Sequence, residues 1–393
     1  MKDKIEYSLF SRKEIDRRYD KARTLMAEKK IDVLLITGEE NFHYFSGSCA
    51  SIAIHNSVAR PSVFLLPLQG EPILLTQSAK NLILSTYVSD IRSFSAVLNF
   101  PYSVIVDALK EVKWKYSRVG AELGQEQRMG IPVQAYLSLM NALPKTEFVD
   151  AADIFIKLRS IKSPEELAYI KKAAEITGRA RQRLFDRYIT PGMTERDVAR
   201  KIGQLMMEEG ADRPAFVHLQ LDLPGDSNQF HYERLLKKGT ILAVDAGAYV
   251  QMYTVDYPRH ATLGKATQAQ KDVHRRVLDI NQMMADALKP GVRASDIHRV
   301  AVAAIEKVGA TVENPERLTG GARFGHGQGM LITEPPSVNP LDHTVLEPGM
   351  VISTEPSIRL GAEHCKWEDV HVVTESGHEQ ISVETSALRE IAW

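Results

Sequence analysis

The chain has 393 residues, which is too many for one ordinary hydrophobic core, so we expect two domains. Hydrophobic residues at 44% and charged residues at 25% are typical of a globular protein and exclude a disordered or fibrous one. The 49 Lys and Arg residues are balanced by 50 Asp and Glu residues, which argues against a nucleic-acid partner. Two cysteines form no disulfide framework, and no uncharged run approaches bilayer length, so we expect a cytoplasmic protein without a membrane partner.

The first 155 residues alternate between helical and strand patterns. Apolar residues at three- and four-residue spacing predict amphipathic helices, and short apolar runs bounded by turn residues such as Gln69-Gly70 predict strands. The expected elements are a helix at 11–30, a strand at 32–37, a hairpin of strands 62–66 and 72–76, a helix at 105–112, a strand at 118–122 and a helix at 133–142. This alternation predicts an α/β domain.

A strong helix start follows this domain. Ser163 is placed as the N-cap, Pro164 takes the first helical position, and Glu165 and Glu166 lie in the first turn. We therefore divide the chain into domains at 1–155 and 156–393, with an α/β (α+β) fold overall.

The second domain contains an internal repeat. Residues 191–198 (PGMTERDV) align with residues 290–297 (PGVRASDI), and each segment opens a helix that ends in Gly-Ala after the same length. Residues 239–245 (GTILAVD) align with residues 349–355 (GMVISTE), and each has a glycine, a strand and then a carboxylate. The repeat predicts two half-domains that pack about a pseudo-twofold axis.

Each of these strands is followed by a second carboxylate at the distance of a return strand. Asp256 follows Asp245, and Glu368 follows Glu355. Four carboxylates brought together in an apolar interior repel one another and are costly to desolvate unless a cation is present. The pattern therefore indicates a metal site.

His326 supplies a nitrogen ligand for such a site. It lies among Gly325, Gly327 and Gly329, a flexible setting that indicates a histidine facing something small and charged. One imidazole and four carboxylates suit Mn²⁺, Fe²⁺, Co²⁺ or Zn²⁺, and five ligands favour two ions with a bridging water as the nucleophile. Separate roles, such as a turn residue at Asp245, are the alternative.

These motifs resemble the creatinase/prolidase group of pita-bread metallohydrolases, which includes Xaa-Pro dipeptidases, aminopeptidase P and methionine aminopeptidases. The resemblance covers nearly the whole chain. It rests on Ile161 to Glu166, Val244 to Gly247, Val255-Asp256, Gly325 to Gly327, Pro348 to Met350, Glu355-Pro356, Glu368-Asp369 and, in the first half, Asn41 to Gly47. It implies a creatinase-like domain at 1–155 and a pita-bread catalytic domain at 156–393.

The resemblance also implies roles for single residues. The implied ligands of two divalent ions are Asp245, Asp256, His326, Glu355 and Glu368, with Mn²⁺ expected and Co²⁺, Fe²⁺ or Zn²⁺ as alternatives. Glu355 is also the implied general base. His231 matches a histidine beside the metals that assists the leaving amine or the oxyanion. A homodimer is expected, and the loop 56–60 is a candidate contributor to it.

Three positions depart from the family pattern. Thr333 stands where proline-specific members carry a substrate-contacting histidine, Ala322 replaces another histidine, and Lys366 replaces an arginine. We expect Thr333 and Lys366 to bind substrate, although lysine offers a point charge where arginine offers a bidentate fork.

The leading hypothesis is a metal-dependent hydrolase that cleaves Xaa-Pro dipeptides or N-terminal Xaa-Pro bonds. One alternative is a hydrolase or lyase that acts on a small non-peptide carboxylate or amide, since the substrate-contacting histidine is missing. Another is a binding protein that keeps a metal pocket without turnover, against which the complete ligand set argues.

Overall fold

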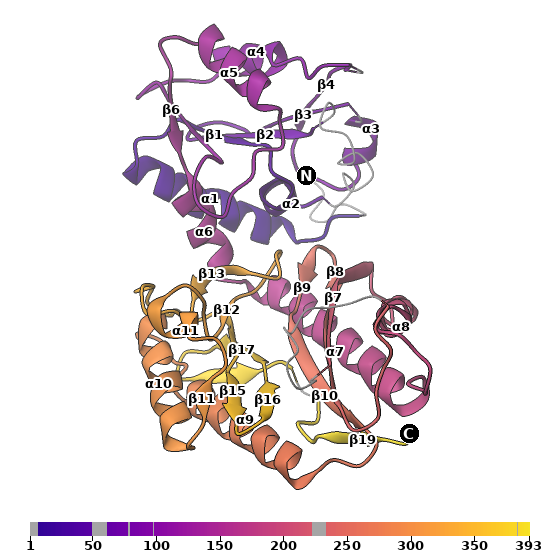
Figure 1. Ribbon diagram of the computed structural model, residues 1–393. Coiled ribbons are helices and arrows are strands. Elements are labelled where there is room, and N and C mark those ends of the chain that lie inside the picture. Colours follow the sequence, from indigo (N-terminus) through magenta and orange to yellow (C-terminus); the bar gives the residue numbers. More distant parts are fainter. Residues whose placement is uncertain (1–6, 49–60, 78, 97, 222–232, 383) are drawn as a thin grey trace. The chain divides into compact units, whose positions relative to one another are not determined.

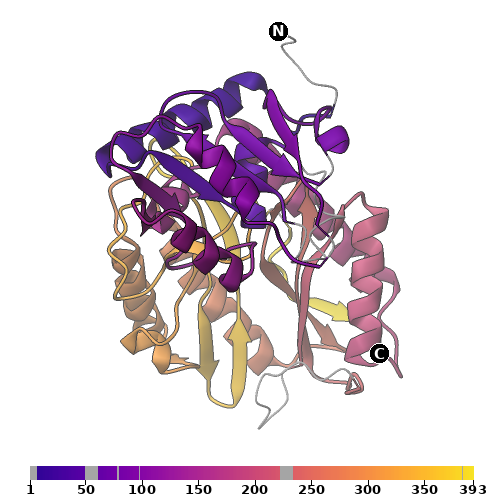
Figure 2. The ribbon, with the colours of Figure 1, turned by 90° about the horizontal axis from the view of Figure 1, so that it is seen from above.

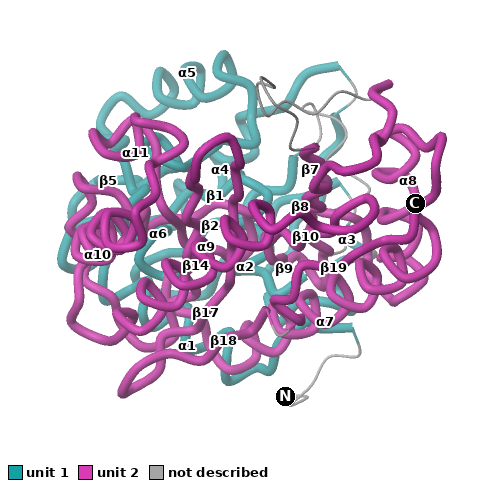
Figure 3. Tube along the Cα trace, turned by 60° about the horizontal axis from the view of Figure 1, so that its bottom comes forward, with its two compact units in different colours: residues 1–159 teal, residues 160–393 magenta. Residues whose placement is uncertain are grey.

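The computed structural model describes residues 7–48, 61–77, 79–96, 98–221, 233–382 and 384–393 (Figure 1). The chain forms two compact units, Met1–Arg159 and Ser160–Trp393, coloured separately in Figure 3. The boundary proposed from the sequence, after residue 155, falls inside a helix, Ala152–Ser160 (α6), most of which belongs to unit 1. Phe155 of this helix contacts Phe45 edge-to-face, which ties it to the unit 1 core.

In unit 1 the described part of the chain forms a six-stranded mixed sheet with helices on both faces (Figure 1). Its elements are α1 (Arg12–Glu28), β1 (Val33–Ile36), α2 (Glu39–Ser46), β2 (Val63–Pro67), β3 (Ile73–Thr76), α3 (Ala79–Leu82), β4 (Asp90–Ser93), α4 (Ser103–Lys110), β5 (Arg118–Ala121), α5 (Val133–Ala142), β6 (Glu147–Asp150) and α6. The strand order is β4-β3-β2-β1-β5-β6, with β1, β5 and β6 parallel.

The alternation of side chains along the strands explains the two covered faces. Val33 and Leu35 of β1 join the core with α4 and α5, whereas Phe64 of β2 contacts Tyr19 of α1 and Phe45 of α2. Every helix and strand expected in this half is confirmed to within a few residues. The strands β4 and β6 were missed because they are short, partly exposed edge strands without an apolar run.

The described residues of unit 2 form two five-stranded sheets and a three-stranded one. Its first half comprises α7 (Pro164–Arg187), α8 (Glu195–Glu208), β7 (Arg213–Leu221), β8 (Ile241–Val250), β9 (Tyr253–Thr254) and β10 (Tyr257–Leu263). Its second half comprises α9 (Gln268–Asp286), α10 (Ala294–Lys307), β11 (Thr311–Val312), α11 (Glu316–Thr319), β12 (His326–Gly327), β13 (Glu334–Ser337), β14 (Val351–Thr354), β15 (Ser357–Leu360), β16 (Glu363–Lys366), β17 (Asp369–Val373), β18 (His378–Gln380) and β19 (Arg389–Ile391).

The two halves repeat one pattern, as expected from the sequence. The helices α8 and α10 each have 14 residues, and each is preceded by an isolated bridge, Thr194 to Leu235 and Arg293 to Val345. The antiparallel pair β8 and β10 corresponds to the pair β14 and β17. Asp256 and Glu368 directly precede β10 and β17, and Glu355 directly follows β14, whereas Asp245 lies within β8.

Each half covers its sheet with its own helices. The helices α7 and α8 pack on the sheet β19-β10-β8-β7, and α9 and α10 share a core with β14 and β15. The last strand, β19, pairs in parallel with β10, and its Arg389 side chain contacts Asp186 of α7; Figure 2 shows β19 in yellow near the C-terminus. Among the described residues, no helix has the length and apolarity needed to cross a membrane.

Candidate metal centre

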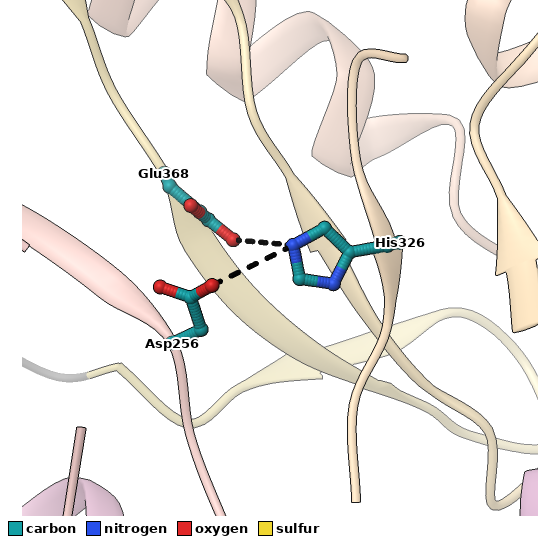
Figure 4. Close-up of side chains that lie close together, drawn as sticks. All are labelled: Asp256, His326 and Glu368. Atoms are coloured by element: carbon teal, nitrogen blue, oxygen red, sulfur yellow. Dashed lines mark ion pairs between the residues drawn. The ribbon is translucent and has the colours of Figure 1, made fainter. Parts of the chain in front are cut away.

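Asp256, His326 and Glu368 meet in the interior of unit 2 (Figure 4). The His326 Nε2 atom lies 3.5 Å from Glu368 Oε1 and 3.7 Å from Asp256 Oδ2. Ligand atoms that each lie about 2.1 Å from one ion are roughly 3.0–3.5 Å apart, so these separations suit a bound metal. In the part of the chain that the structure describes, these three side chains form a group whose ligand atoms all lie within 4.8 Å of one another. We call them the metal triad.

The triad is assembled from three strand ends. His326 begins β12, Asp256 directly precedes β10, and Glu368 directly precedes β17. The ligands therefore come from both halves of the repeat, and all three side chains are buried.

Close backbone packing explains the glycines beside His326. A Cβ atom on Gly325 would lie 2.0 Å from the carbonyl oxygen of Ser353, and one on Gly327 would lie 2.4 Å from that of Pro335. These glycines allow β12 to fit between β13 and β14. The flexibility inferred from the sequence is not their role.

The protonation state of His326 suits a role as a metal ligand. Its Nδ1 lies 3.1 Å from the carbonyl oxygen of Gly327, which can only accept a hydrogen bond, so Nδ1 carries the proton and Nε2 presents a lone pair to the carboxylates. Burial lowers the pKa of His326 to about 4, although the charge of Glu355 acts in the opposite direction. The imidazole is therefore neutral at pH 7.

The two carboxylates of the triad are buried, and Lys366 Nζ lies 3.7 Å from Glu368 Oε2. Burial, followed by the charges of Asp245 and Glu368, raises the pKa of Asp256 well above its usual value, and burial and the charge of Glu355 do the same for Glu368. Asp256 Oδ1 and Glu368 Oε2 are buried without a hydrogen-bond partner among the described residues. The lone pair of His326 Nε2 faces two carboxylates, an arrangement that is favourable when a cation lies between them. The triad therefore fits a divalent ion.

The other two predicted ligands, Asp245 and Glu355, contact Lys366. The Lys366 Nζ atom lies 2.8 Å from Glu355 Oε1 and 3.1 Å from Asp245 Oδ2. Burial lowers the pKa of Lys366, but Asp245 and Glu355 outweigh this effect and raise it well above the usual value. We call Asp245 and Glu355 the carboxylate pair.

Glu355 also has a second cation nearby. The Arg317 Nη2 atom lies 3.6 Å from Glu355 Oε1, and Arg317 Nη1 donates a 2.8 Å hydrogen bond to the Glu355 carbonyl oxygen. Burial alone would raise the pKa of Glu355, but Lys366 and Arg317 lower it to about 2. Glu355 is therefore ionised at neutral pH.

Backbone contacts hold the triad in place. The Gln328 side chain accepts a 2.9 Å hydrogen bond from the Asp256 amide and donates a 2.8 Å bond to its carbonyl oxygen. Arg259 donates a 3.0 Å bond to the Glu368 carbonyl oxygen and a 2.7 Å bond to Asp369. Asp369 in turn accepts a 2.8 Å bond from the Trp367 indole, which is buried. Trp367 is thus a packing residue rather than a wall of the substrate pocket.

A cavity of about 450 Å³ opens beside the triad. It is lined by Asp256, His326, Glu355, Ser337, Asn339, Arg317 and the segment 320–323. Arg323 donates a 2.9 Å hydrogen bond to the Thr333 hydroxyl. Ala322, which replaces a family histidine, also lines this cavity, so the lining combines two basic side chains, Arg317 and Arg323, with a small one.

The roles predicted for Thr333, Lys366 and His231 stay predictions. Thr333 contacts a cavity residue, and Lys366 faces carboxylates. His231 and the loop 56–60 lie outside the described residues.

Arg317, Arg323 and Gln328 were missed by the sequence reasoning. Gln328 lies within the glycine-rich motif, and both arginines lie within ten residues of His326. The available signal was that these residues lie close to His326 in the sequence. Arginines near a motif are commonly exposed on the surface, so the direction of the two arginine side chains could be known only from the fold.

Two regions of the chain match known protein families. Residues 168–375 match metallopeptidase family M24, and residues 18–161 match the Creatinase/Prolidase N-terminal domain. The fold and the site thus define a metallohydrolase with an N-terminal creatinase-like domain and a pita-bread catalytic domain. The chain belongs to metallopeptidase family M24, within the creatinase/prolidase group, and is a metal-dependent peptidase.

Full-length relatives share this organisation. The Xaa-Pro dipeptidase of Pyrococcus furiosus is 28% identical over 377 residues, which cover 93% of this chain and 97% of the relative. An uncharacterized peptidase of Bacillus subtilis is 25% identical over 92% of this chain and 97% of its own length.

Solved structures confirm the fold. A Xaa-Pro dipeptidase from Bacillus anthracis superposes with a TM-score of 0.81 at 22% identity, over 96% of this chain and 100% of that one. The prolidase from Pyrococcus horikoshii gives 0.78 at 24% identity, over 94% and 99% of the two chains.

Proposed function

We propose that this chain hydrolyses Xaa-Pro dipeptides or N-terminal Xaa-Pro peptide bonds, with Mn²⁺ as the first candidate ion. The observation that carries the proposal is the buried metal triad in a chain whose full-length relatives include Xaa-Pro dipeptidases. Two ions are predicted from the sequence, and Lys366 contacts two of the five predicted ligands.

Asp256, His326 and Glu368 would hold the ion, and a bound divalent ion supplies Lewis acidity and an acidified water. The chain's own residues orient this site. Gln328 and Arg259 anchor the backbone of the two carboxylates, so both side chains keep their direction toward His326. The side chains of the triad are buried, and burial strengthens the electrostatic interactions within the site.

Glu355 is proposed to take the proton of the attacking water. A pKa of about 2 keeps it ionised and able to accept a proton. Lys366 and Arg317 also make it a weak base, so proton transfer depends on how acidic the bound water becomes. His231, which lies outside the described residues, remains the proposed donor to the leaving nitrogen.

Arg323 is proposed to bind a carboxylate of the substrate. It lines the cavity beside His326, and its described hydrogen bond goes to the neutral Thr333 hydroxyl. A carboxylate would form charge-assisted hydrogen bonds with the guanidinium group. This arrangement favours dipeptides, whose free carboxylate lies close to the scissile bond, over longer peptides.

The same cavity supports the alternative of a small non-peptide carboxylate, because Thr333 and Ala322 leave its wall without the family's histidines. A panel of Gly-Pro, Ala-Pro, a longer Xaa-Pro peptide and N-acyl amino acids, assayed with Mn²⁺, Co²⁺ and Zn²⁺, separates these functions. Release of the N-terminal residue from Xaa-Pro dipeptides supports the proposal. No cleavage of any Xaa-Pro substrate by the metal-loaded protein would refute it.

A homodimer is also proposed. Sedimentation of the purified chain tests this assembly directly, and a monomer at micromolar concentration would contradict it.

A further inference from the structure

Lys366 lies among the carboxylates that the sequence assigns to two metal ions. Its Nζ atom is 2.8 Å from Glu355 Oε1, 3.1 Å from Asp245 Oδ2 and 3.7 Å from Glu368 Oε2. Lys366 is the last residue of β16, and its side chain is only 21% exposed. The side chain of Lys366 is therefore largely shielded from solvent, and β16 fixes where its amine lies.

The two oxygens of Glu368 face different partners. Oε1 lies 3.5 Å from His326 Nε2, whereas Oε2 lies 3.7 Å from Lys366 Nζ. The five predicted ligands thus separate into two groups. The metal triad surrounds a position for one ion, and the carboxylate pair already has a cation in hydrogen-bonding contact.

A second metal ion would compete with this ammonium group. To be bound by the carboxylate pair, an ion must come within about 2.0–2.2 Å of oxygens that already contact Nζ. A divalent ion and an ammonium group at such short range in a buried site repel each other strongly. The lysine would have to leave its three carboxylates before the ion could enter.

We propose that the Lys366 ammonium group takes the place of a second metal ion, so that this chain binds one divalent ion at the metal triad. In this arrangement a side chain of the protein itself supplies the positive charge between Asp245 and Glu355 that a second metal ion would otherwise supply. The inference concerns the same site as the proposed hydrolysis, but the number of ions can be measured without any substrate.

Metal stoichiometry tests the proposal. The full chain is loaded with excess Mn²⁺, freed of unbound metal by gel filtration and analysed for metal and protein content. We expect about one ion per chain, and an electron paramagnetic resonance spectrum of isolated Mn²⁺ without exchange coupling. About two ions per chain, or a coupled pair in the spectrum, would overturn the proposal for the unaltered protein.

Two variants sharpen the test. Lys366→Met removes the charge while keeping a side chain of similar length, and it should raise the stoichiometry to about two ions per chain with a coupled spectrum. Lys366→Arg keeps the charge and should stay at about one. A folded Lys366→Met protein that still binds one ion would contradict the lysine's role, and if this variant does not fold, Lys366→Gln is measured in the same way.

The outcomes also separate this inference from the proposed function. A chain that binds one ion but cleaves no Xaa-Pro substrate refutes the function and leaves the stoichiometry standing. A chain that cleaves Xaa-Pro dipeptides with two ions does the reverse.

Discussion

Single charged residues determine the chemistry of the centre. Glu355 lies between two cations and opens onto the cavity, so it combines an ionised carboxylate with access to substrate. Arg323 lines the same cavity, and its described side-chain hydrogen bond goes to the neutral hydroxyl of Thr333. These two residues have separable effects on turnover and on substrate binding.

Replacing Glu355 with Gln should lower kcat by about 10²–10⁴-fold, because the amide cannot accept the proton of the attacking water. Because Lys366 already occupies the carboxylate pair, metal content should stay near that of the unaltered protein. Steady-state kinetics and metal analysis measure both. The exposed Glu347→Gln variant is the matched control and should behave like the unaltered chain. A Glu355→Gln protein with full kcat would remove the general-base assignment.

Replacing Arg323 with Met should raise KM for Gly-Pro by about 10–100-fold, since a hydrogen bond to a charged group contributes about 1.5–3 kcal/mol. The effect on the amide of Gly-Pro, which lacks the carboxylate, should be much smaller. Arg299→Met removes an exposed arginine of α10 and serves as the control. Equal losses on both substrates would contradict carboxylate binding.

At the level of elements, close packing of strands positions the ligands. The strand β12 pairs with both β13 and β14, and it carries the single nitrogen ligand of the triad. This packing requires glycine where the backbone of one strand meets carbonyl groups of the next.

Gly327→Ala tests this requirement. The added Cβ would lie 2.4 Å from the Pro335 carbonyl oxygen and 2.7 Å from that of Glu334, so β12 must move and carry His326 away from the carboxylates. We expect at least a tenfold weaker affinity for Mn²⁺, measured by titration calorimetry, together with a lower Tm. Gly377→Ala, whose Cβ meets nothing within 4 Å, should leave both unchanged. Unaltered metal affinity in Gly327→Ala would show that β12 tolerates the side chain.

At the level of the whole molecule, the ion should contribute to the stability of unit 2. The metal triad joins strand ends from both halves of the repeat, and its carboxylates repel each other without a cation. Ligand binding to the folded state alone raises the free energy of unfolding.

Removing the metal with a chelator should therefore lower Tm. Adding Mn²⁺ at about 100 times its Kd should raise the free energy of unfolding by about 2.7 kcal/mol and restore Tm. Thermal unfolding followed by circular dichroism measures the shift. His326→Ala is the control, because it loses the nitrogen ligand and should respond little to Mn²⁺. A Tm that does not depend on metal in the unaltered chain would argue against a resident ion at the triad.

The sequence by itself determined the two-domain division in outline, the repeat and the set of residues that gather at the centre. It could do so because a repeat with a fixed spacing of glycine, strand and carboxylate gives Asp245 and Glu355 equivalent positions in the two halves, although Asp245 lies within β8 and Glu355 directly follows β14. The short edge strands β4 and β6 were not predicted from the sequence, since partly exposed strands need no apolar run.

Only the tertiary structure decided that the predicted ligands divide into the metal triad and the carboxylate pair. Whether Lys366 faces a substrate or the carboxylates depends on the direction of β16 and on a flexible side chain, neither of which follows from its place in a motif. The same holds for Arg317 and Arg323, whose positions near Glu355 and Thr333 depend on where the fold places α11 and the segment that follows it. Distances of a few ångströms between charges set the chemistry, and these arise from packing between strands that are far apart in the chain.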